Sequence, residues 1–141
     1  MKIVLIHTSI SGIGFNSFGI DQEGTWIHHG LCLISAYAKK KGYSIDLIDL
    51  RKLKGWKNFR QEIITKKPDI VGITMMSPDY DYAIKCIDIV KDVNKNIKTI
   101  VGGPHPSIMP EELSNNSNID YIITGEGEIS FSELLYNIEN N

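Results

Sequence analysis

The chain has 141 residues, of which 42% are hydrophobic and 23% charged, and its formal net charge is −2. This length suits one domain with its own core, and the charge gives no electrostatic reason to expect nucleic acid or an anionic membrane as partner. No apolar run approaches the ~20 residues of a membrane span, and no signal peptide precedes the first strand pattern. Cys32 and Cys86 fall in apolar helical patterns, so we expect buried free thiols and a cytoplasmic protein.

Strand and helix patterns alternate along the chain. β-branched or alternating runs predict strands at 2–8, 44–50, 70–76, 98–101 and 120–124. Apolar residues three and four apart predict helices at 30–41, 56–67, 81–93, 109–114 and 130–139. In the last helix Ser130 is expected to be the N-cap and Glu133 to complete a capping box. Residues 9–25 are predicted to form a long loop, which in a compact domain is usually functional or mobile.

This alternation predicts an α/β fold with a parallel sheet covered by helices on both faces. Five strands fit a flavodoxin-like, doubly wound three-layer sandwich with strand order 2-1-3-4-5 and right-handed crossovers. The second strand is expected at the edge, because one of its faces stays polar. In this order a ligand would meet the loops after strands one, three, four and five at the carboxyl edge of the sheet.

The segment 99–106, Thr-Ile-Val-Gly-Gly-Pro-His-Pro, is the clearest candidate for such a ligand site. Gly102 and Gly103 let the backbone turn sharply and let something large approach it closely. Pro104 and Pro106 are expected to prevent a helix from starting at once and to stiffen the loop. Loops 9–25, 77–80 and 125–128, which are rich in glycine, serine or proline, follow the other strands of that edge.

Other chemistries fit less well. A Rossmann site needs a third glycine and an immediate helix after Ser11-Gly12-Ile13-Gly14, and both are missing. A phosphate loop at 8–12 leaves an FMN-binding electron carrier as an alternative, although the predicted helix starts over ten residues later. A receiver domain needs acidic residues where the chain has His7-Thr8-Ser9 and Met75-Met76-Ser77. The histidines lack metal-site spacing, and Glu126 and Glu128 are interpreted as capping the last helix rather than as general acid and base.

Five stretches form a pattern together: Gly-Leu…Ala-Tyr…Lys-Gly-Tyr in 30–43, Asp…Asp-Leu in 46–50, Val-Gly-Ile…Ser in 71–77, Val-Gly-Gly-Pro-His-Pro in 101–106 and Thr-Gly-Glu-Gly-Glu in 124–128. They resemble the N-terminal cobalamin (B12)-binding domain of B12-dependent radical S-adenosylmethionine enzymes. The nearest subgroup includes the anaerobic magnesium-protoporphyrin monomethyl ester oxidative cyclases and related methyltransferases. The resemblance covers essentially the whole chain, and its last two motifs are the most specific.

The resemblance implies one domain, 1–141, that holds cobalamin against the carboxyl edge of the sheet. The nucleotide tail would run beside strands three and four, and the corrin would cover the loops after strands one, three and five. No catalytic residue and no metal ligand is expected. The residues implied in cofactor binding are Thr8, Ser9, Met76, Ser77, Gly102, Gly103, Pro104, His105, Gly125, Glu126 and Gly127.

The chain departs from related B12 domains in two respects. In methionine synthase and the mutases a D-x-H-x-x-G motif supplies a cobalt-ligating histidine, but here Thr25 and Ile27 stand at the Asp and His positions. Cobalamin is therefore expected base-off, without a lower histidine ligand. The C-x-x-x-C-x-x-C motif of the radical half, which would carry the 4Fe-4S cluster and S-adenosylmethionine, is absent from these residues. We expect no turnover by this segment alone; a degenerate docking domain is a further alternative.

Overall fold

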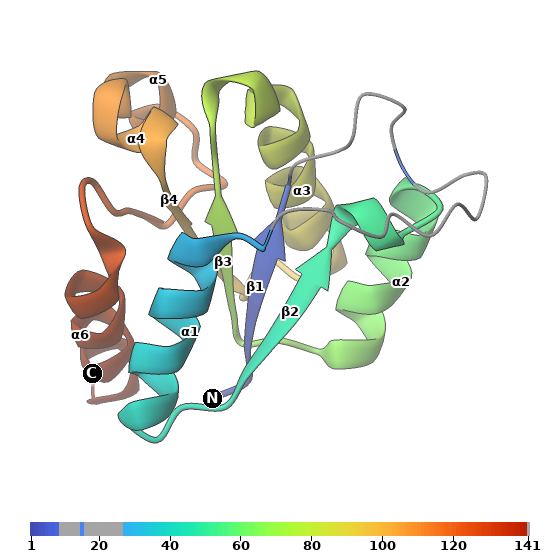
Figure 1. Cartoon of the computed structure of the whole chain (residues 1–141). Helices are drawn as coiled ribbons and strands as arrows, with labels where there is room; N and C mark the ends of the chain where they lie inside the picture. The colour runs from blue at the N-terminus through green and yellow to red at the C-terminus, as the bar shows by residue number, and fades with distance from the viewer. Residues whose placement is uncertain (9–14, 16–26, 141) are drawn as a thin grey trace.

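The structure is a computed structural model, and it describes residues 1–8, 15 and 27–140. Within these ranges strands and helices alternate (Figure 1). The strands are β1 (Ile3–His7), β2 (Ile45–Asp49), β3 (Ile70–Thr74), β4 (Lys98–Gly102) and β5 (Tyr121–Ile122). The α-helices are α1 (His29–Lys40), α2 (Trp56–Lys66), α3 (Tyr80–Val93), α4 (Pro104–Ile108), α5 (Pro110–Ser114) and α6 (Gly127–Asn140). Two short 3₁₀ helices, η1 (Leu50–Lys52) and η2 (Ser77–Asp79), complete the described elements.

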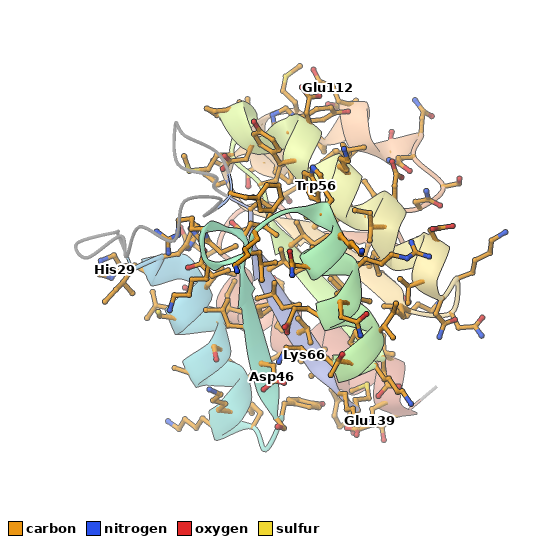
Figure 2. All side chains as sticks on the ribbon, turned by 90° about the vertical axis from the view of Figure 1, so that its right-hand side faces the viewer. His29, Asp46, Trp56, Lys66, Glu112 and Glu139 are labelled. Atoms are coloured by element: carbon orange, nitrogen blue, oxygen red, sulfur yellow. The ribbon has the colours of Figure 1, made fainter. Side chains whose placement is uncertain are left out.

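The five strands form one parallel sheet in the order β2-β1-β3-β4-β5. This confirms the predicted flavodoxin-like fold and the edge position of the second strand. At that edge, Lys66 at the end of α2 lies 3.3 Å from the Asp46 carboxylate of β2 (Figure 2). Strand β5 is shorter than predicted, because its ladder with β4 covers only Ile100 and Val101.

Helices cover both faces of the sheet. Figure 1 shows α1 and α6 on one face and α2 and α3 on the other. Alternate residues of each central strand enter opposite cores, as the two-residue period requires. In β1, for example, Val4 and Ile6 pack in the core beneath α2 and α3, whereas Ile3 and Leu5 pack in the core beneath α1 and α6.

The prediction that prolines would delay the helix after β4 is wrong, because α4 begins at Pro104. Proline suits the first turn of a helix, where its missing N–H would have no helical partner. Gly103 makes the turn between strand and helix with φ of 109°, a backbone conformation that favours glycine.

Two further predictions need correction. Helix α6 begins at Gly127, so Ser130 lies within the helix and the predicted capping box is wrong, although Glu128 does lie in the first turn. Cys86 is buried as expected, but Cys32 is exposed, because the buried face of α1 is narrower than its apolar pattern suggests. No helix in the described part of the chain is long and apolar enough to cross a membrane.

Candidate ligand-binding cleft

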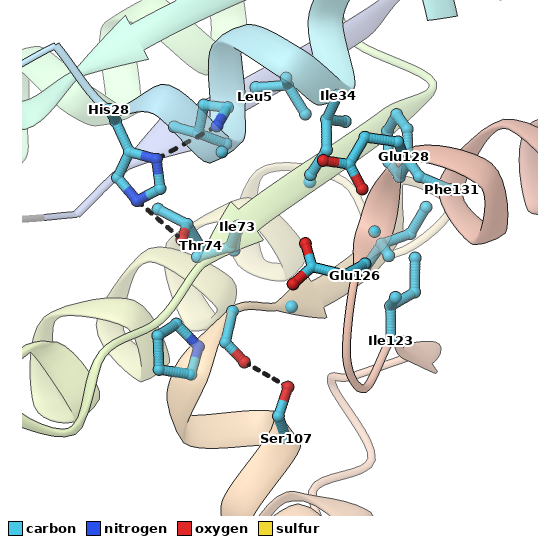
Figure 3. Close-up of a pocket in the computed structure, with 18 of the residues that line it drawn as sticks. Leu5, His28, Ile34, Ile73, Thr74, Ser107, Ile123, Glu126, Glu128 and Phe131 are labelled. Atoms are coloured by element: carbon cyan, nitrogen blue, oxygen red, sulfur yellow. Dashed lines mark hydrogen bonds between the residues drawn. The ribbon is translucent and has the colours of Figure 1, made fainter. Parts of the chain in front are cut away.

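A cleft of about 460 Å³ lies between the sheet and helices α1 and α6 (Figure 3). Its volume falls within the range of about 300 to 1,000 Å³ that is usual for small-molecule sites. Residues of β1, β3 and β4 form its floor, α1 and α6 form its walls, and the loops after β4 and β5 surround its mouth. It therefore occupies the carboxyl edge of the sheet, where the strand order predicts ligand binding.

Two glycines in neighbouring strands line this cleft, and they differ in what lies over them. Gly72 lies in the middle of β3, and a Cβ built on it would lie 2.7 Å from Leu5 Cδ2 and 3.3 Å from Phe131 Cε2. Gly102 ends β4, and a Cβ there would meet nothing nearer than the Ile123 carbonyl oxygen at 3.6 Å. Both positions face α1 and α6, but Leu5 and Phe131 fill the space over Gly72, so the open slot of the cleft lies over Gly102 at the end of β4.

Gly103 has a different role from these two glycines. A Cβ on it would lie 2.9 Å from the Met75 carbonyl oxygen, a backbone atom that cannot move aside easily. Together with the positive φ, this contact makes glycine necessary for the turn itself. Gly102 therefore provides space for a ligand, whereas Gly103 is required by the protein's own backbone.

His28 and Thr74 form a polar pair at one side of the cleft (Figure 3). His28 is the N-cap of α1: its Nδ1 accepts a hydrogen bond from the Leu31 N–H at 3.1 Å. Nε2 therefore carries the proton of the neutral ring and donates to Thr74 Oγ1 at 3.3 Å. Thr8, at the end of β1, is fully buried. Its hydroxyl donates a hydrogen bond to the Thr74 carbonyl oxygen at 2.8 Å and so holds the end of β3 in place.

Burial keeps the two neighbouring imidazoles of this region neutral. It lowers the pKa of His28 below the ordinary 6.5, and burial together with the charge of Arg51 lowers the pKa of His7, although Asp49 opposes this shift. The two rings make an edge-on contact with centroids 5.1 Å apart. Both rings are therefore uncharged at neutral pH.

A fall in stability with acidification follows from these lowered pKa values. The unfolded chain takes up protons on His28 near pH 6.5, whereas the folded chain resists them, so the stability contributed by the neutral ring is lost as the pH falls below about 6.5. In His28→Asn, which retains an N-cap oxygen, the Tm should fall less steeply between about pH 7.5 and pH 5.5. Thermal melts of the wild type, of this variant and of the exposed control His29→Asn, each over this pH range, would check this. The control should keep the wild-type slope of Tm against pH. Equal slopes in all three proteins would contradict it.

The opposite side of the mouth carries a hydroxyl and two carboxylates. Ser107 Oγ donates to the Gly103 carbonyl oxygen at 2.8 Å and accepts from the Gly125 N–H at 2.9 Å. It thereby joins the loop after β4 to the loop after β5. Glu126 and Glu128 also line the mouth, across the cleft from His28 (Figure 3). The polar side chains of the mouth thus contrast with an apolar floor.

The residues predicted for cofactor binding divide into two groups. Those that line the cleft are Gly102, Gly103, Pro104, Gly125, Glu126 and Gly127. Thr8, Met76, Ser77 and His105 are not among the lining residues, and Ser9 lies outside the described residues. The motifs after the fourth and fifth strands are therefore brought together at the cleft, whereas Thr8, Met76, Ser77 and His105 do not line it.

His105 links two of the loops at this edge instead of facing the cleft. It is buried, its Nδ1 lies 3.1 Å from Ser77 Oγ, and its Nε2 lies 3.2 Å from Glu112 Oε2. The ring also contacts Tyr80 edge-on, with centroids 5.1 Å apart. His105 thus connects helix α4 to the segment that follows β3 and to helix α5. These contacts fix the positions of the segments beside the mouth of the cleft.

Several lining residues were missed at the level of sequence. Thr74 and Ser107 carry hydroxyl groups at the mouth, and Gly72 lines the floor. A glycine within a β-branched strand indicates that other atoms approach the backbone closely at that point. The position of Gly72 in the run 70–76 therefore could have been predicted from the sequence. Thr74 and Ser107 carry no such signal, since isolated hydroxyls occur throughout the chain.

Fold and cleft together define a doubly wound α/β domain with a cleft between its sheet and helices α1 and α6. Residues 18–135 match the B12 binding domain family, and the chain belongs to this family. It is 33% identical over 132 residues, 91% of its length, to the anaerobic magnesium-protoporphyrin IX monomethyl ester cyclase of Rubrivivax gelatinosus. It is 29% identical over 70 residues, 49% of its length, to the cobalamin-dependent radical SAM methyltransferase TokK of Streptomyces tokunonensis.

These matches cover only 23% and 10% of the two relatives, so the chain spans a quarter or less of their length. Among solved structures, a cobalamin-binding protein from Desulfitobacterium hafniense DCB-2 superposes with a TM-score of 0.68 at 17% sequence identity. That superposition covers 96% of this chain and 57% of the other, and it supports the fold. The chain is thus a cobalamin-binding domain related to radical S-adenosylmethionine enzymes.

Proposed function

We propose that residues 1–141 form the cobalamin-binding module of a radical S-adenosylmethionine enzyme that transfers methyl groups or closes a tetrapyrrole ring anaerobically. The module acts in the cytoplasm with a radical domain that carries the 4Fe-4S cluster and S-adenosylmethionine, and it has no turnover alone. Support comes from the relatives, which include a cyclase and a methyltransferase. When bound, cobalamin supplies a cobalt centre that can carry a methyl group or an electron.

The single observation that carries this proposal is the open slot over Gly102. A Cβ there would enter the cleft and meet no protein atom nearer than 3.6 Å, so the residues present leave room for a group laid against the end of β4. Thr74 and Ser107 offer hydroxyls to the polar parts of a nucleotide tail, and Glu126 and Glu128 can accept hydrogen bonds from the amide groups of a corrin. In this proposal the module binds and orients the cofactor.

We propose further that cobalamin is held base-off, without a histidine ligand from the chain. Both ring nitrogens of His28 are engaged, one by the Leu31 N–H and one by Thr74 Oγ1. Ile27, at the position of the ligating histidine in other B12 domains, has no donor atom and is 67% exposed. The EPR spectrum of the Co(II) form should show no nitrogen superhyperfine splitting. A splitting that changes when the protein is labelled with ¹⁵N-histidine would contradict this.

Reconstitution tests the function directly. The purified chain should retain hydroxocobalamin through gel filtration at about one corrin per chain, whereas FMN should elute with the small molecules. Absorbance distinguishes the corrin from the flavin. Retention of FMN but not of cobalamin would favour the electron-carrier alternative, and retention of neither would favour a domain that serves only for docking.

A further inference from the structure

The His28 ring connects the sheet to the first turn of α1 at one side of the cleft. Its Nδ1 accepts a hydrogen bond from the Leu31 N–H at 3.1 Å, and its Nε2 donates to Thr74 Oγ1 at 3.3 Å. The ring also lies close against Gly30, where a Cβ would be 3.3 Å from His28 Cε1. Gly30, Leu31 and Thr74 all line the cleft. One imidazole therefore holds three of the residues that shape the wall.

The Thr74 hydroxyl lies beside the open slot over Gly102. Thr74 pairs with Gly102 in the ladder between β3 and β4, and its Oγ1 would be 3.1 Å from a Cβ on Gly103. Because Oγ1 accepts a hydrogen bond from His28, its own hydrogen points away from the ring and can be donated to an oxygen atom of a ligand. His28 thus sets the direction in which this hydroxyl donates.

This arrangement requires a neutral imidazole. A protonated ring carries hydrogen on both nitrogens, so Nδ1 can no longer accept from the Leu31 N–H, and two N–H groups face each other. The N-terminus of α1 carries a partial positive charge, which adds to the repulsion. Protonation of His28 should therefore loosen the first turn of α1, and with it the part of the wall that Gly30 and Leu31 form.

The groups around the ring favour its neutral form. Within the part of the chain that the structure describes, the titratable and charged groups that face it are His7 of β1, Arg51 of η1, Asp79 of η2 and His29 of α1. Burial, Arg51 and His29 lower the pKa of His28, whereas a backbone hydrogen bond and Asp79 offset this only in part. Asp49 is engaged by Arg51, with the two side chains 2.7 Å apart. Glu126 and Glu128 lie across the cleft, so a ligand that fills the cleft separates them from the ring (Figure 3).

We infer that His28 is a positioning residue whose neutral ring holds the cofactor-binding wall, so that binding expels a proton from His28 and weakens as the pH falls. The inference rests on the proposed function, since it requires that cobalamin bind in this cleft. A bound ligand removes water from the ring and so disfavours its charged form further. Because the pKa of His28 then falls on binding, the affinity decreases as the pH drops below about 6.5.

Calorimetric titration with methylcobalamin at about pH 7.5 and about pH 5.5 tests the inference. The wild-type chain should bind at least about threefold more weakly at the lower pH. Near the lower pH it should also release protons on binding, which titrations in two buffers of different ionisation enthalpy measure. His28→Asn keeps an N-cap oxygen but cannot be protonated, so it should lose both effects. The neighbouring His29 is exposed, and His29→Asn is the matched control that should keep them.

A third variant separates positioning from titration alone. His28→Ala removes the cap as well as the ring, so it should bind methylcobalamin more weakly than His28→Asn at both pH values. Equal affinities of these two variants would overturn the positioning role. The same pH dependence in wild type and His28→Asn, or no proton release by the wild type, would overturn the coupling and leave the proposed function standing. Binding by none of the proteins at either pH would overturn the proposed function itself.

Discussion

Cobalamin affinity should fall in steps when Gly102 is replaced by alanine, valine and leucine, and the valine variant should bind at least about 100-fold more weakly, a loss of about 2.7 kcal/mol. The new side chain projects into the cleft, where the nearest protein atoms are Ile123 O at 3.6 Å and Ile123 Cβ at 3.8 Å. It therefore occupies the ligand's space without a clash inside the protein. Because a β-branched residue suits a strand end, we expect thermal melts within a few degrees of wild type.

A matched substitution at the next residue separates ligand exclusion from unfolding. Gly103→Val should lower the Tm strongly, because its Cβ meets the Met75 carbonyl oxygen at 2.9 Å and its φ is 109°. Scanning calorimetry should thus find Gly102→Val folded and Gly103→Val destabilised. Titration calorimetry should find that the folded Gly102→Val protein binds cobalamin poorly. Wild-type affinity in the folded Gly102→Leu variant would mean that the slot is not the cofactor site.

Most of the architecture was predictable because it depends on local periodicity. The apolar run 70–76 predicted a strand, and the alternation of 44–50 predicted an edge strand; both strands are confirmed, although they end at Thr74 and Asp49. Helix starts were harder to predict, because they depend on which backbone N–H groups find partners. Pro104 could begin α4 only because Gly103 had already turned the chain, a fact of three-dimensional geometry that no pattern of residue types contains.

The candidate site was predictable only in part, for a related reason. The glycine-rich loops after β4 and β5 were expected at the mouth, since strand exits share one edge of a parallel sheet. The floor of the cleft is made instead by mid-strand positions such as Gly72, and its cover by Ile34 and Phe131 from helices almost 100 residues apart in sequence. Strand register and the packing of α1 on α6 bring these residues together, and neither can be read from spacing along the chain.

A buried ion pair between Lys91 and Asp120, at the end of the sheet away from the cleft, should account for a large share of the free energy of unfolding. Asp120 Oδ2 accepts hydrogen bonds from Lys91 Nζ at 2.6 Å and from the Thr99 N–H at 2.8 Å, and the Lys91 side chain is only 10% exposed. Asp120→Ala leaves that ammonium group buried without its carboxylate. Removing one partner of a buried pair costs about 3 kcal/mol or more, which in a domain of this size lowers the Tm by roughly 10 °C.

The contribution of Asp120 also has a defined pH dependence. Burial raises the pKa of its carboxyl group, but hydrogen bonds from Lys91, Thr99 and Lys98 outweigh this effect and hold the pKa below the ordinary value of 3.8. The unfolded chain therefore takes up a proton before the folded chain does. The contribution is fully present above the unfolded pKa and is lost as the pH falls below about 3.8. Asp120→Asn should remove this acid-dependent part of the unfolding free energy.

Denaturant unfolding of three variants isolates the buried charge as the cause. Asp92→Ala removes the carboxylate of an exposed pair with Arg60 and should change the unfolding free energy by less than about 1 kcal/mol. The double variant Lys91→Met/Asp120→Ala removes both charges, so it should recover much of the stability that Asp120→Ala loses. If the double variant is as unstable as Asp120→Ala, the loss comes from the hydrogen bonds of Thr99 and not from the stranded Lys91 ammonium group.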